Sequence, residues 1–300
     1  MADWDDLRVF LAVARAESLS GAGRGLKLDA ATVGRRIARL EEALASKLFD
    51  KSPQGYALTD AGTRLLPHAE RAETALAGAA EELGGAAGQL TGQLRIGAPD
   101  GCANYLLPQV CADLCDAHPG LEIQIVALPR VFNLSKREAD MAIAVSPPNA
   151  GRLTVQKLTD YQLHLAGSDA YLDRHPEIRS RADLRGHRMI GYIPDMIFDK
   201  ELDYLSETGA ETVGLASNSV SVQMQMVRAG AGLAIVHDFA IPFVPGLRRL
   251  LTRDIALARA FWLIRHADDR RSERLTRLAE ALGQGLRREV ARLEALAAQP

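Results

Sequence analysis

Apolar residues recur at gaps of four, three and four over residues 33–44, the spacing of one buried helix face. The stripe consists of Val33, Ile37, Leu40 and Leu44. Asp29 precedes it, and an aspartate there can accept hydrogen bonds from the free N–H groups of the first turn. An apolar helix over residues 7–14 and a short helix after Ser18 come earlier. The pattern therefore predicts three consecutive short helices.

The polar side of the third predicted helix carries Thr32, Arg35, Arg36 and Arg39. At ~100° per residue, their mean direction lies roughly 120° from the apolar stripe. An arginine fork can bind a guanine edge or a phosphate with two hydrogen bonds. A solvated amphipathic helix is the plain alternative, because such helices usually carry charges. The two preceding helices and the stretch that follows favour a helix that enters a DNA major groove.

Residues 47–59 contain two apolar runs around a turn-forming stretch. Ser52, Pro53 and Gly55 are residue types that favour turns, so we expect a two-stranded wing. At its tip, Lys51, Ser52 and Gln54 could contact phosphates or a neighbouring minor groove. For each of these three residues, a position on an ordinary surface hairpin is an equally good interpretation.

A long helix is expected from Asp60 to about Leu90, because this stretch is rich in Ala, Leu, Glu and Arg. Pro67 lies near its start, where a missing hydrogen bond is tolerable, and Gly84 and Gly85 break it. Its small residues could pair with a second copy of the chain, and a plain spacer helix is the alternative. A dimer would double the DNA contacts of a single recognition helix through two-fold symmetry.

The remaining two thirds alternate strand-like and helix-like segments, which indicates an α/β fold. We expect one helix over residues 102–117 and a closing amphipathic helix over 270–298. Strands are predicted at residues 94–98, 121–125, 141–145, 188–193, 212–216, 233–236 and 260–265, and residues 153–166 are expected to form one or two more.

The composition limits the function class. Three hundred residues predict two or more domains, and a net charge of −2 requires any DNA affinity to come from a local patch. Residues 24–51 supply that patch, with seven Lys/Arg against four acidic residues. No apolar run approaches the ~20 residues that cross a bilayer, and the acidic start lacks a secretory pattern, so we expect a cytoplasmic protein.

Candidate catalytic chemistry is sparse. The sequence contains no Gly-x-Ser-x-Gly, His-Glu-x-x-His or Walker motif, and its three cysteines, Cys102, Cys111 and Cys115, have no metal spacing. His237 and Asp238 are the only neighbours that suggest acid–base work, and such a pair at a strand end is usually structural or a pocket wall. We therefore expect no enzyme, no cofactor and no metal.

These motifs in combination resemble the LysR-type transcriptional regulators. The matched parts are residues 10–14, Ser18, residues 33–41, Leu44, residues 48–49 and residues 58–62, with a looser match at 93–98, 106–108, 118–119, 138–143 and 229–235. The chain departs from the family where Gly21, Gly23 and Gly25 replace small residues or alanines, at a cost of ~1 kcal/mol per helical glycine. Residues 29–32 also lack the usual hydroxyl-rich turn, which removes potential base-reading side chains.

The resemblance implies a specific domain plan. It gives an α/β chain with an all-α winged helix-turn-helix over residues 1–60, a linker and dimerisation helix with its hinge over 61–91, and an effector-binding domain over 92–300. That domain would resemble periplasmic solute-binding proteins. Its subdomain I would cover about 92–162 and 267–300, and its subdomain II about 163–266.

The resemblance also implies an effector cleft between the two subdomains. By motif, its residues would be Asp100, Gly101, Cys102, Arg130, Phe132, Tyr192, Pro194, Asn218, Ser219 and His237. A helix start at Asn218 and Ser219 would suit an anionic ligand. An ionised Asp100 would disfavour a carboxylate there and favour an amine or a neutral polar effector. The alternative for Asp100 is that it only caps the helix that follows it.

The function predicted from these features is a sequence-specific regulator whose promoter contacts change when a small co-inducer binds the cleft. Its predicted partners are double-stranded promoter DNA, the effector, copies of itself in a dimer or tetramer, and RNA polymerase. Two other classes remain open at this point. One is a small-molecule binding protein whose helical N-terminus is an interaction module, and the other is an enzyme that uses His237 and Asp238.

Overall fold

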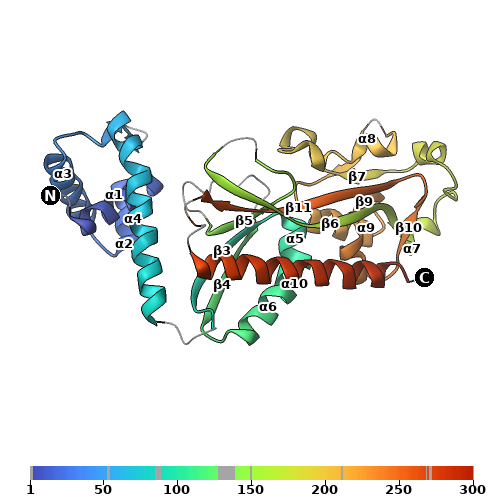
Figure 1. Cartoon of the computed structure of the whole chain (residues 1–300). Helices are drawn as coiled ribbons and strands as arrows, with labels where there is room; N and C mark the ends of the chain where they lie inside the picture. Colours follow the sequence, from blue (N-terminus) through green and yellow to red (C-terminus); the bar gives the residue numbers. More distant parts are fainter. Residues whose placement is uncertain are drawn as a thin grey trace. The chain divides into compact units, whose positions relative to one another are not determined.

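The computed structural model describes residues 3–52, 55–84, 89–127, 139–148, 151–210, 212–267, 269 and 272–299. The chain divides into two compact units (Figure 1). The first contains residues 1–87, and the second begins at Gly88. The domain limits predicted from the sequence are finer than this division and stay a prediction.

The first unit has three short helices, a hairpin and a long helix. Its elements are α1 (Trp4–Ala16), α2 (Leu19–Leu26), α3 (Ala30–Ala43), β1 (Phe49–Ser52), β2 (Gly55–Leu58) and α4 (Asp60–Gly84). Ser18 caps α2 by accepting from the N–H of Gly21 at 3.0 Å. Asp29 caps α3 by accepting from the N–H of Thr32 at 2.8 Å. The predicted order of elements and the cap by Asp29 are confirmed, and Ser18, expected only to precede the second helix, is its cap.

The core of this unit is small and apolar. Val33, Ile37 and Leu40 of α3 pack there with Phe10 of α1. Phe49 of β1 joins them, with its ring centroid 5.3 Å from that of Phe10. Leu44 was predicted to complete the buried stripe, but it is 36% exposed because α3 ends at Ala43 and Leu44 is its C-cap.

The glycines of α2 are not equivalent. A Cβ at Gly23 would lie 2.5 Å from the backbone carbonyl oxygen of Leu28, closer than real Cβ contacts allow. Gly23 therefore lets the turn before α3 fold tightly against α2. A Cβ at Gly25 would meet nothing within 4 Å, so the cost of that glycine is only the intrinsic one.

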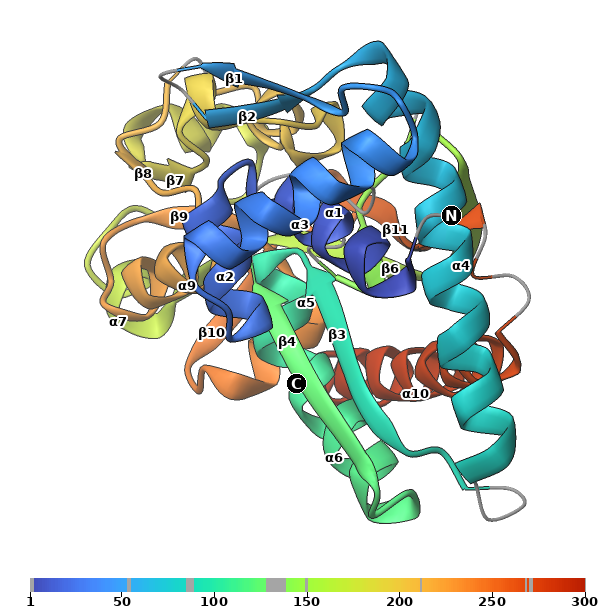
Figure 2. The same cartoon turned by 90° about the vertical axis from the view of Figure 1, so that its left-hand side faces the viewer.

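Among the described residues, the second unit is built on a nine-stranded mixed sheet with the order β4-β3-β5-β11-β6-β9-β7-β8, in which β10 also pairs with β6. Figure 2 shows β3 and β4 side by side at one edge of this sheet. The strands are β3 (Gly92–Ala98), β4 (Leu121–Ala127), β5 (Met141–Ala144), β6 (Leu153–Ser168), β7 (Met189–Gly191), β8 (Leu215–Ala216), β9 (Leu233–His237), β10 (Leu247–Leu250) and β11 (Ala256–His266). β7, β8 and β11 differ in length from the predicted strands, and β10 was not predicted.

Two long strands join the halves of this sheet. β11 pairs antiparallel with β6 over the whole length of β11, from Leu153 to His164 of β6, with an irregularity between Phe261 and Trp262. At one end β11 pairs with β5, and at the other end β6 pairs with β9 and β10. The subdomain limits predicted near residues 162 and 266 fall within these strands and stay a prediction.

Helices and short 3₁₀ turns cover the sheet. They are α5 (Asp100–Tyr105), α6 (Leu107–Ala117), α7 (Asp169–Leu172), η2 (Arg181–Gly186), η3 (Pro194–Met196), η4 (Lys200–Leu202), α8 (Leu205–Thr208), α9 (Val220–Arg228), η5 (Asp238–Phe243) and α10 (Glu273–Ala297). The single helix predicted over residues 102–117 is wrong, because the chain bends at Leu106 and two helices form.

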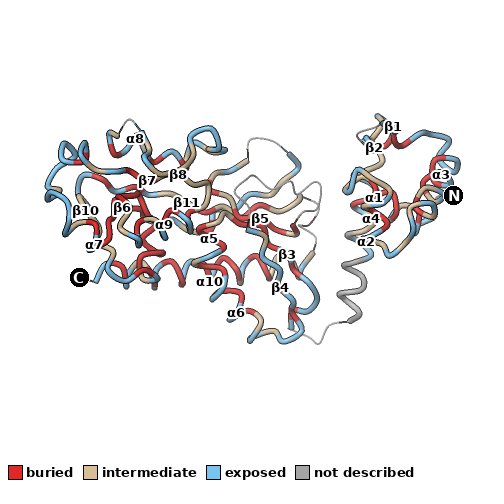
Figure 3. Tube along the Cα trace, turned by 180° about the vertical axis from the view of Figure 1, so that it is seen from behind, coloured by how far each residue is buried: buried red, intermediate tan, exposed pale blue. Residues whose placement is uncertain are grey.

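The closing helix α10 buries one apolar face along the second unit (Figure 3). Leu278, Leu282, Leu286, Val290 and Leu293 form that face, at the gaps of three and four expected of an amphipathic helix. Within the described ranges, no helix combines the length and apolar character needed to cross a membrane.

Candidate nucleic-acid interface and ligand cleft

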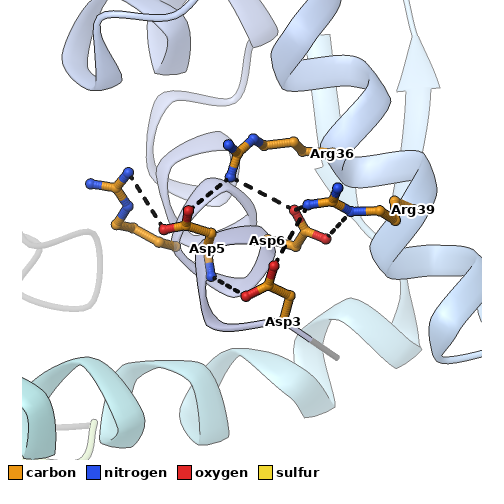
Figure 4. A network of polar contacts seen from close by, with 6 residues as sticks. Asp3, Asp5, Asp6, Arg36 and Arg39 are labelled. Atoms are coloured by element: carbon orange, nitrogen blue, oxygen red, sulfur yellow. Dashed lines mark hydrogen bonds and ion pairs between the residues drawn. The ribbon is translucent and has the colours of Figure 1, made fainter. Parts of the chain in front are cut away.

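The arginines of α3 fall into two sets. Arg36 and Arg39 turn toward the first turn of α1 (Figure 4). Nε and Nη2 of Arg39 each donate to the carboxylate of Asp6, which is only 2% exposed. Nη1 of Arg36 lies 3.3 Å from Asp5 and 3.9 Å from Asp6. The guanidinium groups of this set are thus already partnered inside the unit.

The acidic partners have a local reason to be there. Asp3 caps α1, and Asp5 and Asp6 lie in its first turn, where negative charge is favoured by the helix dipole. The ion pair and hydrogen bonds with Asp6 raise the pKa of Arg39 above its ordinary value. The expectation that all the α3 arginines simply face outward is therefore too simple, since the Arg36 side chain is only 27% exposed.

The second set consists of Arg35 alone, whose side chain lies near the start of α3. Its Nη2 donates to the hydroxyl oxygen of Thr32 at 2.8 Å, and that hydroxyl donates to the Asp29 carboxylate at 2.7 Å. These contacts hold the pKa of Asp29 below its usual value, the Thr32 N–H being the main cause. Arg35 is exposed and forms no ion pair with any residue that the structure describes.

Other cations surround this helix. Arg24 and Lys27 at the end of α2 and Lys51 on β1 are exposed, and none of them pairs with an acid in the described part of the chain. Lys47 instead lies 2.6 Å from Glu41, whose carboxylate also accepts from the N–H of Leu48 at 2.8 Å. Glu41 thereby fixes the start of the wing.

The hairpin predicted as a wing is present, with Ser52 opposite Gly55 at its tip. Lys51 and Ser52 are both exposed there, and Gln54 lies outside the described residues. Sequence reasoning missed the role of Asp5 and Asp6. The acidic start of the chain was the available signal, because acidic side chains are favoured in the first turn of a helix and can pair with nearby arginines.

In the second unit, the side chain of Asp100 connects α5 to the start of α9 through hydrogen bonds. Its Oδ2 accepts from the backbone N–H of Ser221 at 2.9 Å and from the hydroxyls of Ser219 and Ser221 at 3.0 and 3.2 Å. Its Oδ1 accepts from the side-chain amide of Asn104 at 3.1 Å. The idea that Asp100 caps the helix that follows it is wrong. Pro99 is the N-cap of α5, and the Asp100 carboxylate lies at the N-terminus of α9 instead.

A pocket of about 20 Å³ lies beside this contact. A cavity of roughly 10–15 Å³ is the minimum for one water molecule, so little more than a water fits in the observed conformation. Six of the predicted cleft residues line it: Asp100, Gly101, Cys102, Tyr192, Asn218 and His237. Pro99 and Val220, which belong to the chain segments expected at the cleft, also line it, whereas the sequence had not indicated Val145, Phe198, Leu202 and Phe261.

The remaining predicted cleft residues lie elsewhere. Ser219 caps α9 and donates to Asp100. Pro194 lines a neighbouring cavity and not this pocket. Arg130 and Phe132 lie outside the described residues.

His237 is a buried, neutral wall of the pocket. Burial lowers its pKa to about 4, against a small opposing effect of Asp100. Its ring stacks on Tyr161 with centroids 5.4 Å apart, and its Nδ1 finds no hydrogen-bond partner within the described chain.

Asp238 points to a different network. It accepts from Nη1 of Arg249 at 2.9 Å and lies 2.9 Å from Nδ1 of His164. The two neighbours His237 and Asp238 therefore do not form an acid–base pair. Across the described ranges, no group of three or more His, Cys, Asp or Glu is arranged to hold a metal.

Comparison with known proteins adds family information to this geometry. Residues 4–63 match the bacterial regulatory helix-turn-helix proteins of the lysR family, and residues 87–287 match the LysR substrate binding domain. The chain is 26% identical to the HTH-type transcriptional regulator PtxR of Pseudomonas aeruginosa, over 78% of this chain and 76% of that protein. It is also 26% identical to a probable hydrogen peroxide-inducible genes activator of Mycobacterium avium, over 93% of this chain and 92% of that protein.

Solved structures share the fold. Full-length OxyR from Pseudomonas aeruginosa, in a variant form, superposes with a TM-score of 0.70 and 20% identity, covering 96% of this chain and 98% of its own. CrgA from Neisseria meningitidis gives a TM-score of 0.58 and 21% identity, covering 94% and 98%.

Proposed function

The chain belongs to the LysR family of bacterial transcriptional regulators, and we propose that Arg35 and Thr32 are the centre of its contact with promoter DNA. Members of this family bind promoter DNA and effectors and form oligomers; they are regulators and not enzymes. The observation that carries the proposal is the exposed guanidinium of Arg35, which is hydrogen-bonded to Thr32 and forms no ion pair within the described chain. Its attraction to Asp29 is the smallest of the effects on that carboxylate. A base edge or phosphate can complete its hydrogen bonds.

The other cations would act at the margins of this contact. Arg36 and Arg39 would add charge that Asp5 and Asp6 partly neutralise. Lys51, Ser52 and Gln54 of the wing would contact the backbone, and such contacts set register but not sequence preference.

The experiment that tests this proposal starts with genome-wide footprinting, which supplies a bound promoter. Fluorescence anisotropy on that duplex, at one fixed salt concentration, then compares Arg35→Ala with the parent. We expect about tenfold or greater weakening, the loss typical of one base-reading arginine. The matched control is Arg248→Ala in β10, which removes one exposed arginine already paired with Asp169. Equal affinity of Arg35→Ala and the parent would contradict the proposal.

For the effector, we propose the pocket beside Asp100 and His237 as the binding site. The Asp100 carboxylate already accepts the free N–H of Ser221 at the start of α9, the group that an anionic effector would need. A carboxylate ligand would also be repelled by Asp100. The effector class that fits is therefore a cationic amine or a neutral polar molecule that donates hydrogen bonds to this carboxylate.

Effector binding would act by changing the separation of the two halves of the second unit. The pocket holds about 20 Å³, so an effector has to bind a more open state and would shift the population toward it. Thermal unfolding of the full chain against matched amines, neutral amides and carboxylates tests this proposal. Stabilisation by carboxylates alone would contradict it.

Peroxide sensing, suggested by the name of one relative, has no support in the thiols. Burial raises the pKa of Cys111 to about 12 and that of Cys102 further still. The thiolate is the nucleophile in such chemistry, so these two cysteines are poor candidates for oxidation. Cys115 is the third and last cysteine of the chain, and its sulfur donates to the carbonyl of Leu121.

Three further parts of the proposal go beyond the family assignment. We propose that α4 pairs with its copy in a dimer or tetramer, that the regulator acts in the cytoplasm, and that RNA polymerase is its partner at activated promoters. In this proposal the DNA-binding domain ends at residue 60, the linker helix with its hinge ends at residue 91, and the effector-binding domain begins at residue 92. Analytical ultracentrifugation with and without promoter DNA tests the first part, and a polymerase recruitment assay on the footprinted promoter tests the last.

A further inference from the structure

A second cavity, of about 330 Å³, lies next to the pocket of about 20 Å³ beside Asp100 and His237 (the closed pocket). It is bounded by β7, by Ile235 of β9 and by Gln223 of α9. The chain from Pro194 to Thr208 forms its other wall, mainly through Ile197, Leu202 and Tyr204. All these residues belong to the second unit.

We propose that this cavity binds an uncharged, largely apolar small molecule of about two fused rings. An apolar cavity of ~150 Å³ is enough for benzene, so this one has room for roughly twice that ligand. Its volume also lies at the lower end of the range of ~300–1,000 Å³ usual for small-molecule sites. The closed pocket beside Asp100 is more than ten times smaller.

The chemistry of the lining sets the ligand class. No lysine, arginine or histidine lines the cavity among the described residues, so an anion would have no counter-charge. Burial raises the pKa of Tyr192 and of Tyr204 well above the usual value, so both phenols stay neutral. Asp203 is the one acidic residue in the described lining, and it is exposed to solvent.

The cavity also offers a polar anchor. Gln223 is 4% exposed, and its amide nitrogen donates to the carbonyl of Ser217 at 2.7 Å. Within the described chain its amide oxygen accepts no hydrogen bond, so it can accept one from a ligand N–H or O–H. A neutral bicycle with a single donor, such as indole, matches the apolar walls and this acceptor.

The cavity and the closed pocket share a wall. Tyr192 and Leu202 line both, and the rings of Tyr192 and Tyr204 lie 5.9 Å apart in an edge-to-face arrangement. A ligand in the cavity would therefore contact the wall of the proposed effector pocket without occupying that pocket.

The test uses indole as the probe, with the full-length chain and isothermal titration calorimetry. We expect saturable binding of one indole per chain, a negative heat-capacity change from apolar burial, and at least tenfold weaker binding of the anion indole-3-acetate. No saturable binding at millimolar indole would overturn the proposal, and so would tighter binding of the anion.

Variants locate the site. Val213→Phe adds bulk to a partly exposed lining residue, and Ile197→Phe does the same from the opposite wall. Either should weaken indole binding at least tenfold, and the second serves if the first unfolds. The matched control is Val222→Phe on α9, which is 44% exposed and lies outside the lining. If folded Val213→Phe and Ile197→Phe proteins bound indole like the parent, the cavity would not be the site.

A third variant separates this inference from the proposed function. Asp100→Asn alters the effector pocket and should leave indole affinity within about twofold. If Asp100→Asn abolished indole binding and the cavity variants did not, indole would occupy the effector pocket, and the inference would fail. Indole binding also needs no DNA, so a failure in the promoter assays leaves this test unaffected.

Discussion

The carboxylate of Asp100, on α5, accepts a hydrogen bond from the backbone N–H of Ser221 in the first turn of α9, at 2.9 Å. The two residues belong to different helices and lie 121 positions apart in the chain. One of the free N–H groups that usually make a helix start attractive to anions is thus satisfied by the protein itself.

Removal of this carboxylate should create an anion site. In Asp100→Ala, the N–H of Ser221 and the hydroxyls of Ser219 and Ser221 lose their acceptor. Because these donors are only partly buried, we expect the variant without additives to lose about 1 kcal/mol of stability, the lower end of the usual cost of a donor left without an acceptor. Acetate or sulfate should then raise its melting temperature more than that of the parent, measured by calorimetry. Asp113→Ala on α6 is the control, and an identical anion response of all three proteins would argue against an internal acceptor role.

Loss of one acid on α1 should strengthen DNA binding. Asp5→Asn removes the partner that lies 3.3 Å from Arg36, so more positive charge reaches the duplex. Because exposed pairs contribute only ~0.2–1 kcal/mol, we expect affinity to rise by no more than about fivefold. The slope of log affinity against log salt should steepen by up to ~0.9, the value for one added phosphate contact.

Asp6→Asn is the variant with which the affinity and stability of Asp5→Asn are compared. Asp6 is buried and accepts both hydrogen bonds from Arg39, so its replacement should lower the stability of the fold more than Asp5→Asn does. Anisotropy with a labelled duplex gives the affinities, and urea unfolding gives the stabilities. Unchanged affinity and slope in Asp5→Asn would mean that Arg36 takes no part in binding.

Two of the three glycines of α2, Gly23 and Gly25, should respond in opposite directions to alanine. Gly23→Ala places a Cβ 2.5 Å from the carbonyl oxygen of Leu28, and overpacking of this kind costs about 1–3 kcal/mol. Gly25→Ala meets nothing within 4 Å and should stabilise the helix by ~0.5–1 kcal/mol. Denaturant unfolding of the full chain, followed by circular dichroism, compares the two. A stabilising Gly23→Ala would show that the α2–α3 turn is looser than described.

Acid should destabilise the protein through His237. Its pKa falls from 6.5 to about 4 on folding because burial disfavours the charged ring. The unfolded state therefore binds the proton first, and stability is lost as the pH falls from about 6.5 to about 4. The full loss from this residue is about 3 kcal/mol.

The measurement is the free energy of unfolding at several pH values in the parent and in His237→Gln. The variant should lose less stability over that window, whereas His68→Gln, at an exposed position on α4, should behave like the parent. A parallel decline in His237→Gln and the parent would mean that other groups cause the acid sensitivity.

Local sequence patterns were sufficient to predict most helices and turns of the first unit. Asp29 caps α3 as predicted, and Ser18 begins the helix expected after it. The long helix expected from Asp60 to about Leu90 ends at Gly84, one of the glycines expected to break it. Helix periodicity, capping and glycine breaks act over a few residues, so a single sequence contains the information. The alternation in the second unit likewise indicated an α/β fold. The break at Leu106 had a local signal in Pro108, which lies in the first turn of α6, whereas the strand β10 had no clear local signal.

What only the tertiary structure decided is which polar groups meet. The sequence alone identified Arg36 and Arg39 as residues of a polar helix face, but their acidic partners come from another helix about 30 residues earlier. Asp100 likewise was a recognisable cleft residue whose partners on α9 could not be assigned. The physical reason is that periodicity determines which side of an element is buried, whereas ion pairs and hydrogen bonds depend on how distant elements approach each other.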